Sequence, residues 1–407
     1  MGWRGTASSI LLLLLVAAVA SAQKQGSRRR SYTVGQVAFK KLEKAHRLLV
    51  EEKYQESRAV VDDLARSKGL SAHELALVHQ TYGWIASSQE KYGDAISSFE
   101  KCLAQDALPT GAQLNTQYNL AQLYMVESRF DRAAASLEDW FTKAEKPGPP
   151  AYYLLATAYL QQDENDKAFV PARKSVELSD QPKEAWLQLL LSLYFDRKSY
   201  PEAATLLKQL VTRFSKKTYW IQLAAVYGEL GEEENSLAVL QIAYLQNLLE
   251  RDQELRRLAQ VYLYHQIPYR AAGVVEKGLE EKVIEPDAEA WELLGNSWLS
   301  AREYERALAP LESAAKLSEK GEVSVRLGQL YIEREEWGKA RKALQQALRK
   351  SKLDDRGRAL LLLGISNFSS GRIDDAQRAF DQAQQHEKTR KSAGRWLKHL
   401  ERKRAAN

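Results

Sequence analysis

A repeated pattern of small residues is the feature that most constrains how this chain can fold. Ten segments of the 407-residue chain can be aligned, and a small residue opens the second half of each at intervals of 33 to 38 residues. These residues are Ser57, Ala95, Ala133, Ala168, Ala203, Ser236, Ala271, Ala307, Ala340 and Ala376. A constant period of this length indicates a repeat protein, in which each repeat is one supersecondary unit.

The first half of most segments carries a matching small residue, usually followed three residues later by an aromatic one. The small residues are Ala45, Gly83, Ala121, Ala156, Ala224, Ala259, Gly295, Gly328 and Gly364, and Leu191 departs from the pattern in the fifth segment. Two helices approach closely only where no large side chain separates them, and an aromatic ring fills the adjoining space with few rotamers. The pattern therefore predicts pairs of helices that stack on their neighbours, because no single pair can bury its own apolar face.

The spacing of these residues matches a known motif. Leu294-Gly295-x-x-Trp298 is followed by Ala307-x-x-x-Leu311, which resembles the tetratricopeptide repeat, a helix pair of about 34 residues. The resemblance implies an all-α fold, a right-handed superhelical solenoid of about ten helix pairs over residues 37–386. We expect residues 387–407 to form a basic capping helix and tail, and residues 23–36 to form a basic, flexible lead-in.

The beginning of the chain predicts export. Arg4 precedes an uninterrupted apolar run at residues 10–19, and Ala20-Ser21-Ala22 supplies small residues before Gln23. This order is typical of a secretory signal peptide, here residues 1–22, and the apolar run is too short for an ordinary transmembrane helix. We therefore expect an exported mature chain without a transmembrane segment.

The charge of the chain is concentrated at its ends. The net charge is +6 overall, and residues 386–407 alone carry +6, while the body between residues 31 and 385 carries −5. A nucleic-acid-binding protein needs a basic stripe across its fold, so we expect no nucleic-acid partner. The basic tail is predicted to be a solvated cap, with weak contact to an anionic membrane surface as the alternative.

No motif in the sequence predicts catalysis, a metal site or a cofactor. The six histidines are scattered, and no zinc, phosphate-loop, dinucleotide or nucleophile-elbow pattern is present. Cys102 is the only cysteine and lies on a predicted apolar helix face, which favours a buried small residue over a reactive thiol. We expect a chain that binds other proteins and is not an enzyme.

Binding is expected on the first helix of each pair, which lines a concave groove in proteins of this kind. Aromatic and amide side chains there would bury apolar area and satisfy the polar groups of a visiting segment. The candidates that flank the packing positions are Trp84, Asn115, Tyr118, Gln122, Met125, Tyr153, Thr157, Gln188, Phe195, Gln260, Asn296 and Gln329.

Several longer stretches resemble one particular set of tetratricopeptide-repeat proteins. Residues 80–84, 113–124, 219–231, 244–246 and 387–390 are similar to periplasmic proteins that accompany TonB–ExbB–ExbD energy-transduction systems in Gram-negative bacteria. The resemblance implies a periplasmic accessory scaffold for uptake through outer-membrane receptors, with components of the TonB system as partners. Two alternatives remain open: a scaffold for envelope assembly, polysaccharide export or secretion, and a non-catalytic subunit of an envelope enzyme.

Overall fold

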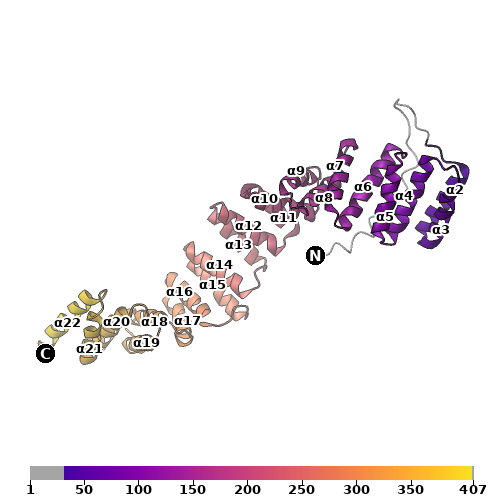
Figure 1. The fold of residues 1–407 in the computed structure, drawn as a ribbon. Coiled ribbons are helices and arrows are strands. Elements are labelled where there is room, and N and C mark those ends of the chain that lie inside the picture. Colours follow the sequence, from indigo (N-terminus) through magenta and orange to yellow (C-terminus); the bar gives the residue numbers. More distant parts are fainter. Residues whose placement is uncertain (1–31, 406–407) are drawn as a thin grey trace. The chain divides into compact units, whose positions relative to one another are not determined.

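The computed structural model describes residues 32–405, and these form helices joined by short turns (Figure 1). The predicted signal peptide and most of the lead-in lie outside the described residues. The first described helix begins at Gln36, the last residue of the predicted lead-in. No strand occurs in the part of the chain from Tyr32 to Ala405.

The helices follow one another in ten pairs, and one more helix follows the last pair. The pairs are α2 (Gln36–Val50) with α3 (Tyr54–Ala65), α4 (Ala72–Ser88) with α5 (Tyr92–Ala104), α6 (Thr110–Val126) with α7 (Phe130–Lys143), α8 (Pro149–Leu160) with α9 (Asn165–Glu177), α10 (Glu184–Asp196) with α11 (Tyr200–Phe214), α12 (Lys217–Glu229) with α13 (Glu233–Leu245), α14 (Asp252–Tyr264) with α15 (Pro268–Glu280), α16 (Ala288–Ser300) with α17 (Tyr304–Leu317), α18 (Gly321–Glu333) with α19 (Trp337–Arg349), and α20 (Arg356–Ser369) with α21 (Ile373–Gln384). The last helix is α22 (Arg390–Ala405). The predicted all-α fold of about ten helix pairs with a C-terminal helix is therefore confirmed.

The chain divides into two units, and the boundary between Leu206 and Leu207 lies within α11. Unit 1 contains the helices from α2 to the first part of α11, and unit 2 contains the remainder up to α22. Within each unit, a helix packs mainly against the helix before it and the helix after it. Each unit is described separately below.

The small residues lie where the two helices of a pair cross. A Cβ atom added to Gly295 on α16 would lie 2.7 Å from Cγ of Leu311 on α17, and the same substitution at Gly83 would meet the ring of Phe99 at 2.5 Å. Where the second helix carries serine at this position, the hydroxyl donates across the crossing, as Ser57 does to the carbonyl of Ala45 at 2.8 Å. The predicted role of these residues in close helix contact is therefore confirmed.

Every pair closes with the same kind of turn. One residue between the two helices has a positive φ. The next residue, which directly precedes the second helix, donates its backbone N–H to a carbonyl in the last turn of the first helix, as Lys91 does to Ala86 at 2.9 Å. The positive-φ residues are Glu52, Glu90, Ser128, Asp163, Lys198, Gly231, Gln266, Arg302, Glu335 and Gly371. This hydrogen bond satisfies a carbonyl that the end of a helix would leave unpaired, as in a Schellman motif.

Successive pairs are joined by a tyrosine and a carboxylate. The hydroxyl of Tyr124 on α6 donates to Glu100 on the preceding α5 at 2.6 Å, and the same bond joins Tyr331 on α18 to Glu312 on α17. Where tryptophan replaces the tyrosine, at Trp298, an arginine completes the contact: the Arg306 guanidinium lies 3.4 Å from the ring centroid. Arg306 also pairs with Glu276 at 2.8 Å, so the carboxylate of the preceding pair is again engaged.

Candidate partner-binding surface

Four aromatic rings form a continuous series across α6, α7 and α8 in unit 1. The ring centroids are 5.4 Å apart for Tyr118 and Trp140, 5.2 Å for Trp140 and Phe141, and 4.7 Å for Phe141 and Tyr152. All four side chains are partly exposed. We call these four residues the aromatic run.

The aromatic run forms because of an unusual residue in the third pair. Trp140 stands seven residues after Ala133, where the other second helices mostly carry a small residue such as Cys102, Ser175 or Ala314. An indole cannot fit into a close helix crossing, so its ring packs at the edge of the pair, and its Nε1 donates to the carbonyl of Leu114 at 3.1 Å. The hydrogen bond satisfies the polar end of the ring and leaves the rest available for contact.

A proline-rich turn positions the next member of the series. The turn between α7 and α8 contains Pro147, and α8 begins with Pro149 and Pro150, which are well tolerated in the first helical turn. Tyr152 lies two residues after Pro150 and packs on Phe141, and the Lys174 ammonium lies 5.2 Å from the Tyr152 ring centroid. The surface therefore combines aromatic area with a nearby cation, a combination that is common at protein interfaces.

Of the predicted binding residues, Tyr118 belongs to the aromatic run. Burial raises the pKa of Tyr118 to about 12, so its hydroxyl stays protonated and can donate a hydrogen bond at neutral pH. Tyr153 on α8 packs against Trp186 on α10, with centroids 6.0 Å apart. Asn115 is exposed near the start of α6, and Gln122 is partly exposed one turn after Tyr118.

The remaining predicted residues of unit 1 are scattered. Met125 is only 8% exposed, so it packs inside the repeat and offers little surface to a partner. Trp84 packs edge-on against Phe99, with centroids 5.2 Å apart. The hydroxyl of Thr157 donates to the carbonyl of Tyr153 at 2.8 Å, whereas Gln188 is exposed and Phe195 partly exposed on α10.

In unit 2 the predicted amides hold neighbouring repeats together. Arg326 on α18 donates to Asn296 on α16 and pairs with Glu292 on the same helix at 3.2 Å. Arg358 on α20 donates to the Gln329 carbonyl oxygen at 2.6 Å. These two amide oxygens already accept hydrogen bonds within the chain, while Gln260 on α14 is exposed.

Sequence reasoning missed Trp140 and Phe141, because binding was expected only on the first helices, and it chose Tyr153 on α8 but not the neighbouring Tyr152. The signal was present in the alignment: Trp140 is a large residue at a position that is usually small. Such a departure indicates a ring that must leave the crossing. The local pattern does not show where the ring goes, since that depends on the neighbouring helix pair.

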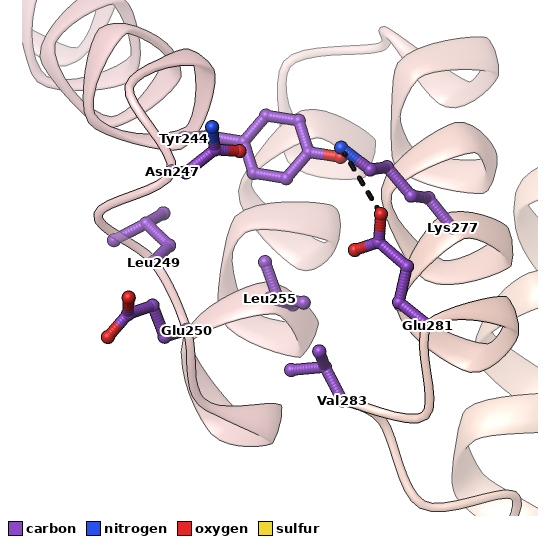
Figure 2. A pocket seen from close by; sticks show the side chains of 9 residues that line it. Tyr244, Asn247, Leu249, Glu250, Leu255, Lys277, Glu281 and Val283 are labelled. Atoms are coloured by element: carbon purple, nitrogen blue, oxygen red, sulfur yellow. Dashed lines mark ion pairs between the residues drawn. The ribbon is translucent and has the colours of Figure 1, made fainter.

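A cavity of about 220 Å³ lies in unit 2, between the end of α13, the following loop and α15 (Figure 2). Leu249, Leu255 and Val283 supply apolar walls, and Lys277 pairs with Glu281 at 3.7 Å on one side. Figure 2 shows the Tyr244 ring close to the Lys277 ammonium, and burial raises the pKa of the Tyr244 hydroxyl. The cavity is smaller than the roughly 300–1,000 Å³ typical of small-molecule and cofactor sites.

Other kinds of site find little support in the described part of the chain. Between Tyr32 and Ala405, no group of His, Cys, Asp and Glu side chains is arranged to hold a metal ion. Cys102 is fully buried, and burial raises the pKa of its thiol to about 12, which disfavours the reactive thiolate. None of the described helices combines the length and the apolar character that crossing a membrane requires.

Ten helix pairs of similar length, joined by one kind of turn, define the class of helical-repeat proteins. The family model described as tetratricopeptide repeat matches residues 118–181, 256–322 and 325–393, and these segments lie in both units. These three segments are therefore tetratricopeptide repeats, as the sequence motif predicts, and the all-helical fold of the described chain is consistent with a solenoid of such repeats. Repeats of this type imply a protein-interaction scaffold and are generally non-catalytic.

Two of the solved structures that match this chain are described as tetratricopeptide-repeat proteins. A tetratricopeptide repeat protein from Parabacteroides merdae is 18% identical, over 73% of this chain and all of that chain, with a TM-score of 0.38. YrrB, whose structure is described as that of a TPR protein with an unusual peptide-binding site, is 17% identical over 47% of this chain and 96% of its own, with a TM-score of 0.39. MamA is 20% identical over 43% of this chain and 94% of its own, with a TM-score of 0.37. No curated protein matches the sequence.

Proposed function

We propose that this chain is a non-catalytic scaffold of the periplasm that binds a partner protein through the aromatic run of unit 1. The partner belongs to a TonB-type energy-transduction system, and the scaffold assists uptake through outer-membrane receptors. The resemblance of residues 80–84, 113–124 and 219–231 to periplasmic repeat proteins of such systems supports the choice of partner. The signal-peptide pattern of residues 1–22 supports export.

One observation carries the binding function: the aromatic run is partly exposed although its rings contact one another. Aromatic side chains dominate the energetics of protein interfaces because they bury large area at low cost in conformational entropy. Exposed Asn115 and partly exposed Gln122 lie on the same helix as Tyr118 and can satisfy the backbone polar groups of a bound segment. The expected ligand is therefore an extended segment or a helix with apolar side chains.

The test is a binding measurement with purified periplasmic domains of TonB and ExbD. Phe141→Lys places a charge within the aromatic run, and we expect it to weaken binding at least about tenfold, the cost of losing one interface anchor. Tyr304→Lys is the matched control, because Tyr304 is an exposed aromatic residue on α17 in unit 2. Circular dichroism checks that both variants remain folded.

The outcomes separate the proposal from its alternatives. Equal weakening by both variants would exclude the aromatic run as the binding surface. If neither TonB-system domain binds and an envelope-assembly machine co-purifies with the chain instead, the TonB assignment is wrong and the assembly scaffold replaces it. Cell fractionation and N-terminal sequencing test the location, with a mature chain that begins at Gln23 as the expected result.

A further inference from the structure

The last helix, α22, has two chemically distinct faces. Ala393 and Leu400 are 0% and 1% exposed, and the Trp396 ring stacks on Phe380 of α21 with centroids 5.6 Å apart. These residues cover the end of the last helix pair (Figure 1). The apolar face of α22 is therefore already used within the chain.

The opposite face carries a row of cations. Lys391, Arg395, Lys398 and Arg402 follow one another at spacings of four, three and four residues, and all four are exposed. On a helix with 3.6 residues per turn, these spacings place the side chains in one stripe about 16 Å long. We call these four residues the cationic stripe.

Some nearby cations form ion pairs, but the residues of the stripe do not. Arg404 pairs with Asp374, and Arg372 and Arg378 both pair with Asp375. Within residues 32–405 the structure shows no ion pair for any member of the stripe; Arg395 donates only to the hydroxyl of Ser392, at 3.3 Å. Four positive charges thus face outward without an ion pair to any described residue.

The geometry limits what can bind there. Peptide recognition uses a groove, a sheet edge or a pocket, and the stripe lies on the outer side of the terminal helix, away from α21. The apolar face is buried, so α22 cannot insert into a bilayer as an amphipathic helix does. A straight row of exposed cations on a rigid helix is suited to a flat surface of dense negative charge.

We propose that the cationic stripe docks this chain on an anionic lipid surface by electrostatic attraction alone. The contact is sensitive to salt, because exposed charges are screened beyond a Debye length of about 8 Å at physiological ionic strength. Several basic residues near such a surface add their attractions, which makes a four-residue stripe sufficient for reversible binding. The inference does not depend on which protein unit 1 binds.

The experiment measures sedimentation of the chain from Gln23 onward, which keeps every described helix, with lipid vesicles. Vesicles of equal parts phosphatidylglycerol and phosphatidylcholine are compared with pure phosphatidylcholine. We expect binding to the anionic vesicles only, and a loss of more than about tenfold in K391Q/R395Q/K398Q/R402Q. Glutamine keeps helix propensity, and a thermal melt checks that this variant is folded.

The matched control neutralises the four basic residues of the lead-in, in K24Q/R28Q/R29Q/R30Q. It changes the net charge by the same amount, and we expect it to retain most of the binding. K391R/K398R, which keeps the charges, should bind like the unmodified chain. Absence of vesicle binding, or equal loss in the two quadruple variants, overturns the proposal, as does tighter binding of soluble polyglutamate than of the vesicles.

Discussion

At the scale of single residues, close contact between helices in this chain depends on glycine at crossing points, where a side chain would collide with the other helix. The Leu311 side chain is fully buried and occupies the space that a Cβ atom of Gly295 would need. By contrast, a Cβ atom added to Gly273 on α15 would meet nothing within 4 Å. Glycine is thus required at one helical position and only tolerated at the other.

Gly295→Leu is therefore expected to lower the free energy of unfolding by about 1–3 kcal/mol, the usual cost of overpacking a well-filled core. Gly273→Leu should leave it unchanged or raise it, because glycine inside a helix costs roughly 0.5–1 kcal/mol relative to better helix formers. Urea unfolding followed by circular dichroism measures both variants. Equal midpoints would mean that the crossing at Gly295 is not close.

Glu74 connects two helices through its carboxylate. It accepts hydrogen bonds from the backbone N–H of Ser71 at 2.8 Å and of Gly35, just before α2, at 2.9 Å. These backbone hydrogen bonds, that of Ser71 first, hold the pKa of Glu74 below its ordinary value. A lowered pKa means that the ionised carboxylate stabilises the fold above the ordinary pKa, and that this stabilisation is lost as the pH falls through the lower folded value.

Glu74→Gln should accordingly cost about 1 kcal/mol at neutral pH, where the wild-type carboxylate is charged. The difference should shrink as the pH falls below about 4, because the wild-type side chain then becomes protonated. Thermal melts of both chains across this range give the comparison. Glu43→Gln, which removes a carboxylate from an exposed position on α2, is the matched control.

At the scale of helices and turns, the turns inside the ten pairs share one backbone geometry but differ in the type of residue that adopts the left-handed conformation. Gln266 has φ 57° in the turn after α14, and Gly371 has φ 76° in the turn after α20. The first is strained by its Cβ atom and the second is not. Only two of the ten positive-φ turn residues are glycine, so most turns of this chain are not at their stability optimum.

Exchanging the residue types should therefore have opposite effects in the two turns. Gln266→Gly is expected to raise the free energy of unfolding by about 0.5 kcal/mol, since relief of strain exceeds the entropy that glycine adds to the unfolded chain. Gly371→Gln should lower it by about 1 kcal/mol. Melting temperatures that shift in the same direction would show that these turns are not equivalent.

The sequence predicted the helix pairs well because their determinants are local. Ala95, Ala133 and Ala307 belong to the recurring small positions and are fully buried. The partner-binding surface was harder to predict from the sequence, because contacts between pairs depend on how consecutive repeats stack. That stacking engages Asn296 and Gln329 with arginines of the next repeat, and places Trp140 beside Tyr118.

At the scale of the whole molecule, cooperativity depends on how extensively neighbouring pairs touch. In unit 2, α13 meets α14 at few positions, whereas α15 with α16 and α19 with α20 pack extensively. The cavity beside Tyr244 and Leu249 lies at this sparse junction (Figure 2). In a repeat array, stability is approximately the sum of the terms for each repeat and each interface.

A fragment of residues 252–407, which starts at α14, should consequently fold alone and melt cooperatively, since it loses only the sparse contacts of α13 with α14 and the ion pair between Lys217 and Glu254. A fragment that starts at Ala288 lacks α14 and α15 and therefore also the extensive interface between α15 and α16. Compared with the 252–407 fragment, its stability should fall by more than the contribution of the removed pair itself. Circular dichroism melts of the two fragments and the longer chain measure this. A 252–407 fragment without helical signal would contradict the ranking of the interfaces.

The uniform turn has a consequence for the history of such a gene. Since the turn inside each pair has the same backbone geometry, deletion or duplication of one period that runs from one such turn to the next joins two ends that already fit. Crossing-over between homologous segments could thus change the number of pairs without disturbing those on either side. The third period, with Trp140 and its proline-rich turn, is the copy whose loss would remove a chemically distinct module.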